Sequence, residues 1–216
     1  MSYEKYSQGF RLFNILTTYG DIWKLKIRED PNIVLEKLKQ FDNDWYPYNS
    51  RKDVSRWGLS ITNLDGVFGP GPDLDSLYEL KHGQDQTHHE NDFNVPTAAY
   101  DIVSNFCDPF KEWLSRTHIL KLSAGGYFPD HIDNRGPAID SFRLIVPLQT
   151  ANASEGGYFI FDNQIINWDY GNVYFLNTCK RHTAFNTNEE FDHIVLVMNI
   201  RLTWESVRAA TKLLIQ

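Results

Sequence analysis

Cysteine is scarce in this sequence: its 216 residues include only Cys107 and Cys179. Two cysteines cannot build a disulfide framework, which excludes the small secreted domains that depend on one. Both residues lie in stretches that look buried, so we expect two reduced, packed thiols. A reducing cytoplasmic environment fits this use of cysteine.

The sequence also lacks a long apolar run. Its first thirty residues interleave charged and apolar side chains, with neither the h-region of a signal peptide nor eighteen consecutive apolar residues. We therefore expect a cytoplasmic protein that has no membrane partner.

Positive charge is in deficit, with 21 Lys and Arg against 28 Asp and Glu and a formal net charge of -7. Surfaces that neutralise phosphates are usually rich in Lys and Arg, so we do not expect nucleic acid as a partner. Apolar residues make up 42% of the chain and aromatic residues 14%, which is enough to bury a core. Because no repeat or linker divides the chain, a single domain over residues 1–216 is expected.

The first part of the chain, residues 1–116, has a helix-rich pattern. A helix is predicted from Asp30, which can cap it, with Pro31 at the first helical position and apolar residues at helical spacing after it. Residues 96–116 also carry an apolar stripe at helical spacing, and Pro109 is predicted to break this stretch into two helices.

After Arg116 the chain consists of short β-branched and aromatic runs separated by turn signals. These runs are "THILKLS", "SFRLIVPLQT", "GYFIFD", "QIINWD", "NVYFLN", "HTAFN" and "HIVLVMNIRLTW". No helical pattern lies between them, so βαβ crossovers are excluded and an antiparallel sandwich or barrel is expected. We place this core at residues 117–204 and a closing helix at 205–216. The predicted class is α+β: mainly β, with a helical N-terminal part packed on the core.

The stretch "YFPDHIDNR" contains a His-x-Asp pair, His131 and Asp133. Residues i and i+2 of a strand project from the same face, so both side chains can face one ion. A third ligand is available in His182, which follows "NVYFLNTCKR" at the end of a later strand, with enough chain between for the intervening strands. Two imidazoles and one carboxylate on one face of an ion leave its other positions open, as in non-haem Fe(II) oxygenases.

These residue types suit ferrous iron. Imidazole ligands hold Fe(II) without the thiolates that favour zinc or an iron–sulfur cluster, and a single carboxylate leaves the ion a net positive charge. The open positions can then accept a bidentate 2-oxo acid and dioxygen. The alternative is that His131 and Asp133 are two polar residues of a structural loop. The later His182 is the feature that favours the metal site.

Together these segments resemble the 2-oxoglutarate/Fe(II)-dependent dioxygenases, which have a double-stranded β-helix (jelly-roll) core. The resemblance runs from His118 to Arg201 through "LKLSAGGYFPDHIDNR", "FRLIVPLQT", "GGYFIFDNQIINWDYGNVYFLNTCKRHTAFN" and "HIVLVMNI". The branch that looks most similar contains the aspartyl/asparaginyl β-hydroxylases and some free-proline hydroxylases. The resemblance implies that His131, Asp133 and His182 bind Fe(II) and that 2-oxoglutarate chelates the iron. It also implies that O2 and the decarboxylation of 2-oxoglutarate to succinate drive the hydroxylation of a C–H bond.

The chain departs from the family pattern where the far carboxylate of 2-oxoglutarate should be held. Family members often use an Arg near the start of the last core strand, but here the corresponding positions carry Asp192 and His193. Arg201 lies too far along that strand to serve the same pocket. Arg143, in the strand after the His-x-Asp pair, can meet a carboxylate with two hydrogen bonds. We therefore expect Arg143 to be the anchor, assisted by a protonated His193.

Two other functions stay open. One is a cupin-like metal enzyme that does not use 2-oxoglutarate, which the altered anchor would suit, and the other is a non-catalytic jelly-roll binding module. For an oxygenase, the expected substrate is an amino acid, a peptidyl side chain or another small polar metabolite, a direction that only the resemblance supplies. Specificity in such proteins comes from loops and from elements outside the core.

Overall fold

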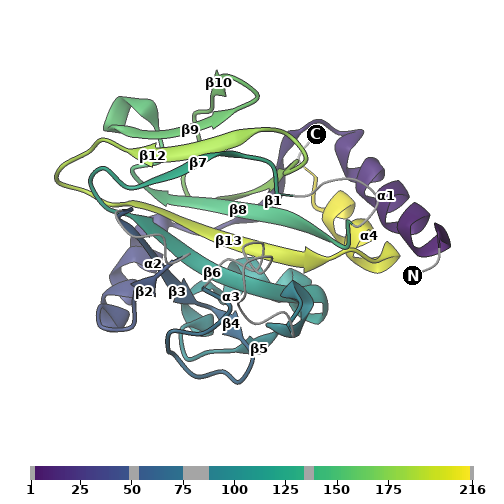
Figure 1. The fold of residues 1–216 in the computed structure, drawn as a ribbon, viewed down its shortest axis with the longest axis horizontal. Helices are drawn as coiled ribbons and strands as arrows, with labels where there is room; N and C mark the ends of the chain where they lie inside the picture. Colours follow the sequence, from purple (N-terminus) through teal and green to yellow (C-terminus); the bar gives the residue numbers. More distant parts are fainter. Residues whose placement is uncertain (1–2, 49–53, 75–87, 134–138, 215–216) are drawn as a thin grey trace.

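The fold is described here from a computed structural model that covers residues 3–48, 54–74, 88–133 and 139–214 (Figure 1). The α-helices are α1 (Tyr3–Thr17), α2 (Pro31–Leu38), α3 (Tyr100–Cys107) and α4 (Trp204–Lys212). Short 3-10 helices are η1 (Lys39–Phe41), η3 (Glu90–Asp92), η4 (Asp108–Trp113) and η6 (Ala153–Glu155). The first strands are β1 (Ile22–Arg28), β2 (Tyr46–Pro47), β3 (Arg56–Ser60), β4 (Thr62–Asn63), β5 (Val95–Pro96) and β6 (Leu114–Leu122). The remaining strands are β7 (Tyr127–His131), β8 (Ser141–Gln149), β9 (Gly157–Phe161), β10 (Gln164–Ile165), β11 (Asn172–Leu176), β12 (His182–Asn186) and β13 (His193–Arg201).

Two antiparallel sheets face each other across an apolar interior (Figure 1). The larger sheet has the strand order β1-β11-β8-β13-β6-β3-β2, and the smaller has the order β10-β9-β12-β7. The apolar cluster between them draws on both sheets: Leu120, Ile145, Tyr174, Leu176 and Val197 come from the larger, and Phe128, Phe159 and Phe161 from the smaller. This arrangement is a double-stranded β-helix, which confirms the predicted fold class.

The N-terminal part supplies strands as well as helices. β1 pairs with β11 at one edge of the larger sheet, and towards the other edge β3 pairs with β6 and β2 pairs with β3. The helix-rich pattern predicted for residues 1–116 included neither α1 nor β1. The core sheet therefore extends beyond the 117–204 segment expected to build it.

The two helical segments predicted from the sequence are confirmed. The side chain of Asp30 accepts a hydrogen bond from the backbone of Asn32 and caps α2, with Pro31 at its first position. α3 ends at Cys107, and the chain continues through Pro109 as the 3-10 helix η4, because proline cannot donate to the preceding turn. Within the part of the chain that the structure describes, no helix is long and apolar enough to cross a membrane.

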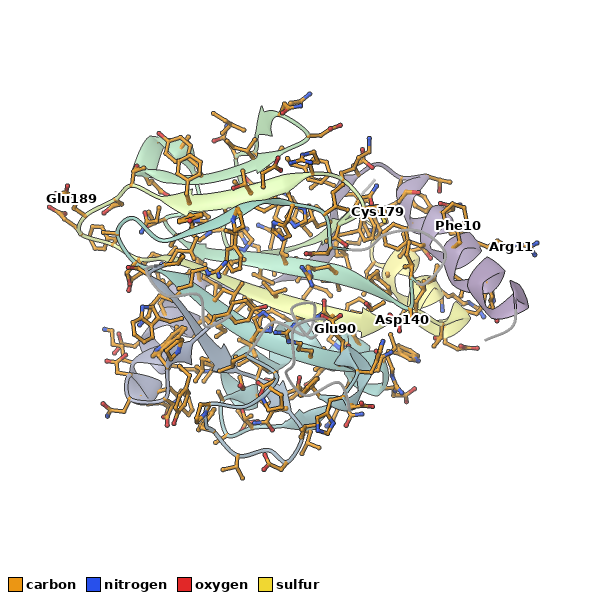
Figure 2. The ribbon with its side chains drawn as sticks, viewed as in Figure 1. Phe10, Arg11, Glu90, Asp140, Cys179 and Glu189 are labelled. Atoms are coloured by element: carbon orange, nitrogen blue, oxygen red, sulfur yellow. The ribbon has the colours of Figure 1, made fainter. Side chains whose placement is uncertain are left out.

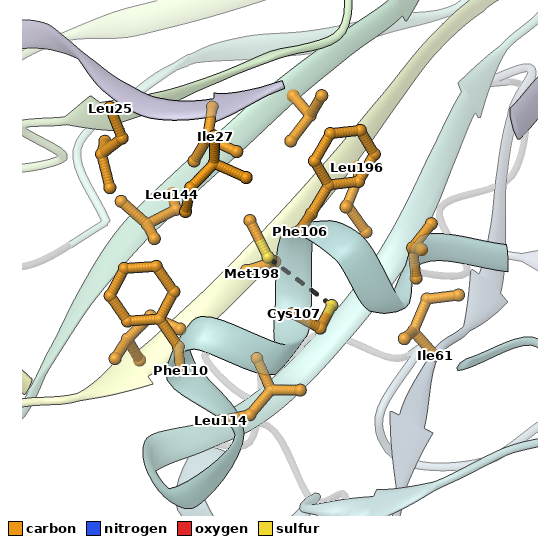
Figure 3. Close-up of a cluster of buried hydrophobic side chains, with 14 of the residues drawn as sticks. Leu25, Ile27, Ile61, Phe106, Cys107, Phe110, Leu114, Leu144, Leu196 and Met198 are labelled. Atoms are coloured by element: carbon orange, nitrogen blue, oxygen red, sulfur yellow. Dashed lines mark hydrogen bonds between the residues drawn. The ribbon is translucent and has the colours of Figure 1, made fainter. Parts of the chain in front are cut away.

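The helices cover the outer face of the larger sheet (Figure 1). In Figure 3, Phe106 of α3 and Phe110 of η4 lie against Leu196 and Met198 of β13. The thiol of Cys107 lies 3.7 Å from the thioether sulfur of Met198. This layer is the main apolar core, and it holds the larger sheet rigid behind the barrel interior.

Alternation along β13 shows how one strand serves both layers. Leu196 and Met198 belong to the helix-facing core, whereas Val195 and Val197 pack with the interior cluster. Side chains of the same parity as Val197 therefore line the interior wall. This rule also places the polar side chain of Asn199 on the inner face.

The stability of this outer core can be tested at Phe175, which is fully buried and packs against the rings of Phe13, Trp23 and Phe142. We expect Phe175→Ala to lower the free energy of unfolding, measured by urea denaturation, by about 3–5 kcal/mol, because it removes buried area and leaves a cavity. Ile165→Ala, at a side chain that is 52% exposed, is the control and should change it by less than about 0.5 kcal/mol. Equal losses in the two variants would contradict this account of the core.

Candidate metal centre

The structure brings together the three residues that the sequence nominates as ligands. His131 is the last residue of β7, Asp133 follows two residues later, and His182 is the first residue of β12. β7 and β12 pair antiparallel with His182 directly opposite His131, and the two ring centroids are 4.3 Å apart. One ligand atom from each of the three side chains lies within 4.8 Å of the others. This spacing allows the three atoms to share one ion.

Backbone contacts hold the two ligand-bearing segments against each other. The amide of Asp133 donates to the carbonyl of Thr178, at 3.1 Å, in the turn that leads into β12. The side chain of Asn177 accepts from the amide of Cys179 and closes that turn. Pro129 lies within β7, which is tolerated because β7 is an edge strand of the smaller sheet. Asp133 is therefore fixed relative to His182 by main-chain geometry.

Each imidazole is oriented by a carbonyl two residues before it. Nδ1 of His131 is 2.6 Å from the carbonyl of Pro129, and Nδ1 of His182 is 2.9 Å from the carbonyl of Lys180. A carbonyl only accepts, so Nδ1 carries the proton in both rings, and Nε2 of the neutral ring is left with its lone pair. Backbone contacts of this kind are the usual way in which a metal-binding histidine is held in one tautomer.

The lone pairs converge on a carboxylate. Nε2 of His131 is 3.1 Å from Oδ1 of Asp133, and Nε2 of His182 is 3.6 Å from Oδ2. Three acceptors at these distances repel one another unless protons or a cation lie among them. The group is therefore built around positive charge.

The pKa shifts of the metal-free site agree with this geometry. Burial alone would raise the pKa of Asp133, but Arg143 and hydrogen bonds from His131 and His182 outweigh it, and the pKa lies well below its usual value. Burial would lower the pKa of His131, but the hydrogen bond and charge of Asp133 raise it overall. These directions agree with a carboxylate that stays charged and attracts positive charge, whether a proton or a cation supplies it.

The donor set itself discriminates among metals. It consists of two imidazole nitrogens and one carboxylate oxygen, the combination suited to Fe(II) with open coordination positions. Burial, with Asp133 and Asp21 nearby, raises the pKa of the Cys179 thiol to about 11, so this neighbour stays protonated at pH 7. The residues therefore fit a ferrous ion better than a thiolate-bound zinc.

Arg143 contacts the candidate site directly. It lies on β8, opposite Leu176 of β11 and Asn199 of β13. Its Nη1 donates to Oδ2 of Asp133, and its Nε donates to Oδ1 of Asn199 at 3.1 Å. The carboxylate that Arg143 meets in this structure is thus that of Asp133, and the guanidinium links this ligand to the interior wall.

His193 lies elsewhere. It opens β13 opposite Leu122 and is six residues from Asn199, about 20 Å along the strand, so the structure does not bring it together with Arg143. Burial lowers the pKa of His193 to about 4, against a smaller opposing effect of the Thr150 backbone. The ring is neutral at pH 7, whereas the sequence analysis expected a protonated partner for a carboxylate.

Several polar residues of the interior wall were missed by the sequence analysis. Arg116 and His118 are buried on β6, and Asn199 is buried on β13 beside Arg143. The sequence does contain a pattern that could have identified them, because polar residues at alternate positions of an otherwise apolar strand mark one face of that strand. Only the pairing of the strands reveals that this face is the interior one.

The segment around η3 is tied to the barrel next to these residues. His89 lies 2.9 Å from the carboxylate of Asp140, just before β8, and Glu90 pairs with Arg116 at 3.4 Å. Glu90 and Asp140 are labelled among the side chains in Figure 2. Arg116 also donates to the carbonyl of Asp73. This network fixes the N-terminal part against the mouth of the barrel.

Comparisons with known proteins were made for the whole chain. No family model and no curated protein matches the sequence. Among solved structures, a prolyl-4-hydroxylase from Pseudomonas putida aligns with 92% of this chain and 99% of its own, with a TM-score of 0.51 and 11% identity. An oxidoreductase of the 2OG-Fe(II) oxygenase family from Burkholderia pseudomallei aligns with 78% of this chain and 79% of its own, with a TM-score of 0.40 and 16% identity. An RmlC-like cupin protein from Desulfovibrio desulfuricans aligns with 41% of this chain and 73% of its own, with a TM-score of 0.30 and 23% identity. At 11% identity, the likeness to the prolyl-4-hydroxylase shows a shared fold.

The support that Arg143 gives to Asp133 can be tested by stability. In the metal-free protein, Arg143→Leu should lower the free energy of unfolding by about 3 kcal/mol, because it leaves a largely buried carboxylate without its guanidinium. Arg181→Leu removes the matching pair with Asp130, whose side chains are 60% and 48% exposed, and should cost less than about 1 kcal/mol. Urea denaturation of both variants measures the difference, and a similar small loss in each would rule out the role assigned to Arg143.

The neutral state of His193 predicts an acid-sensitive contribution to folding. Its folded pKa of about 4 lies below the unfolded value of 6.5, so the unfolded chain takes up a proton first and stability falls as pH drops from 6.5 towards 4. Between pH 7 and pH 4.5, urea denaturation should show that His193→Gln loses about 2–3 kcal/mol less stability than the wild type. An identical acid response in the two proteins would show that His193 does not carry this effect.

Proposed function

We propose that this protein is a non-haem Fe(II)- and 2-oxoglutarate-dependent oxygenase that hydroxylates a C–H bond. The observation that carries the proposal is the convergence of Nε2 of His131 and His182 on the Asp133 carboxylate, with both Nδ1 atoms held by backbone carbonyls. A structural loop has no need to align three acceptors in this way, since their mutual repulsion costs free energy without an ion.

The residues of the site have separate tasks in this proposal. His131, Asp133 and His182 hold the ion, and Arg143 holds the second oxygen of the Asp133 carboxylate so that the ligand keeps one orientation. Bound iron, 2-oxoglutarate and O2 would together supply the oxidant, with 2-oxoglutarate converted to succinate. Aromatic rings shield the site on both sides: Phe128 is 6.3 Å from His131, and Phe159 is 6.1 Å from His182, between ring centroids.

The substrate proposed is an amino acid, a peptidyl side chain or a small polar metabolite. The prolyl-4-hydroxylase among the structural neighbours supports this direction at the level of the fold. The buried polar network of Arg116, Glu90 and Asp73 beside the barrel supports a polar rather than a purely apolar ligand.

Metal-dependent turnover tests the proposal. The metal-free protein, supplied anaerobically with Fe(II) and 2-oxoglutarate, should develop a weak visible charge-transfer band and, on admission of air, should form succinate. His131→Ala and His182→Ala should each lose the band and reduce succinate formation by about 100-fold or more, because each removes a ligand. Absorbance and succinate quantification provide the two measurements.

His88→Ala is the matched control, since His88 is a histidine of the described chain outside the ligand set, and it should retain both signals. A cupin-like enzyme without 2-oxoglutarate chemistry would bind metal but give neither band nor succinate. A binding module would bind neither metal nor 2-oxoglutarate. Either of these results would refute the proposed activity.

A further inference from the structure

Two buried polar atoms of the inner wall near the candidate metal centre have no hydrogen-bond partner among the described residues. They are Nδ2 of Asn199, on a side chain that is 1% exposed, and Nδ1 of His118, on one that is 2% exposed. A buried donor without an acceptor costs about 1–3 kcal/mol, and such groups are rare in native proteins. Two such atoms on one wall indicate a polar group that a ligand would bring.

Both side chains lie on the inner face of the larger sheet. His118 is directly opposite Val197, which packs in the interior cluster, and Asn199 follows Val197 by two residues. Asn199 is opposite Arg143, whose guanidinium reaches the Asp133 carboxylate. The two donors therefore occupy the wall that faces the candidate metal centre.

Their orientation is set by neighbours. Arg143 only donates, so its 3.1 Å contact fixes the Asn199 carboxamide with Oδ1 as acceptor and leaves Nδ2 as a donor. The ring of His118 packs 5.0 Å from the ring of Tyr48, between centroids. Burial, followed by the charges of Arg116 and Arg143, lowers the pKa of His118 well below its usual value. A neutral His118 beside two guanidinium groups can donate one hydrogen bond to an anion.

The contacts of Arg143 place Asn199 close enough to the metal centre for a short dicarboxylic acid. Asn199 is separated from Asp133 by the Arg143 guanidinium alone, because Arg143 contacts both residues. A five-carbon acid whose keto-acid end lies at the ion has its other carboxylate only three carbons further on. That carboxylate can reach the wall without leaving the barrel.

We propose that Asn199 and His118 donate hydrogen bonds to the distal carboxylate of 2-oxoglutarate, beside the Arg143 guanidinium. The inference rests on the proposed function, and it replaces His193 as the partner of Arg143. Arg116 already has three partners, the carboxylate of Glu90, the carbonyl of Asp73 and the hydroxyl of Tyr48, so its part is to supply positive charge to the wall.

Comparing the binding of two keto acids distinguishes recognition of the distal carboxylate from effects on the metal. The protein is loaded with Mn(II) under anaerobic conditions, and its affinities for 2-oxoglutarate and for pyruvate, which has the keto acid but no distal carboxylate, are measured by calorimetry. Asn199→Asp keeps the acceptor for Arg143 and replaces the donor with a negative oxygen. This variant should lower the affinity for 2-oxoglutarate about 100-fold and change the affinity for pyruvate by less than about threefold.

A second variant tests the other donor. His118→Phe keeps a ring against Tyr48 and removes both ring nitrogens. It should lower the affinity for 2-oxoglutarate about tenfold and leave the affinity for pyruvate unchanged. Because this variant adds no charge, it remains informative if Asn199→Asp does not fold.

Asn186→Asp is the matched control for Asn199→Asp. Asn186 is also 1% exposed, but its Nδ2 donates to the carbonyls of Leu122 and Phe191, so this variant should lose stability and keep its 2-oxoglutarate affinity. Wild-type protein that binds neither acid would overturn both the proposed function and this inference. Wild-type binding with an unchanged preference for 2-oxoglutarate in both variants would overturn the inference alone, as would a loss confined to His193→Gln. Equal losses of affinity for 2-oxoglutarate and for pyruvate would also overturn the inference, because they would place the two side chains at the keto-acid end of the ligand.

Discussion

The pairing of β7 with β12 is the constraint on which the candidate site depends. It sets His131 opposite His182, but Phe128 is opposite Ala184, so β7 contains one more residue than β12 over this interval. The extra residue is a β-bulge, and it allows Phe128 and His131 to face the interior although they are three positions apart. A register shift of one residue would turn the imidazoles to the outer face. The geometry of the ligands is thus a property of strand pairing rather than of the His-x-Asp motif alone.

Electrostatics joins folding to function at Asp133. Its carboxylate is largely buried, and an isolated buried charge costs several kcal/mol, far more than an exposed ion pair returns. Arg143 and the two imidazoles offset this cost in the metal-free protein. A bound cation would take over part of that task, so the same contacts serve both to fold the barrel and to keep the ligand atoms aligned for the ion.

Much of this architecture could be predicted from sequence, for identifiable reasons. The strands from β6 to β13 carry many β-branched and aromatic residues and are separated by turn residues, and the His-x-Asp pair and His182 stand at strand ends. α1 and β1 were missed because their charged residues obscure the apolar positions, although Leu12, Phe13 and Trp23 prove to be core residues. The assignment of His193 as a partner for Arg143 used sequence offset alone. Offset does not reveal that β13 runs nine residues and separates its two ends by most of the barrel.

The two ends of β13 offer an anion different surroundings: His193 at its start, where family members often carry Arg, and Asn199 near its end. A carboxylate placed at His193 would meet a neutral ring in a desolvated environment, where burial disfavours charge on either partner. Near Asn199 it would meet the guanidinium of Arg143 and the positive charges that, after burial, lower the pKa of His118. Transfer of an anion into the barrel is therefore less costly at the metal end of β13 than at its start. In the proposed function, the polarity of the interior wall, rather than a single basic residue on the last strand, would set the direction in which a bound acid lies.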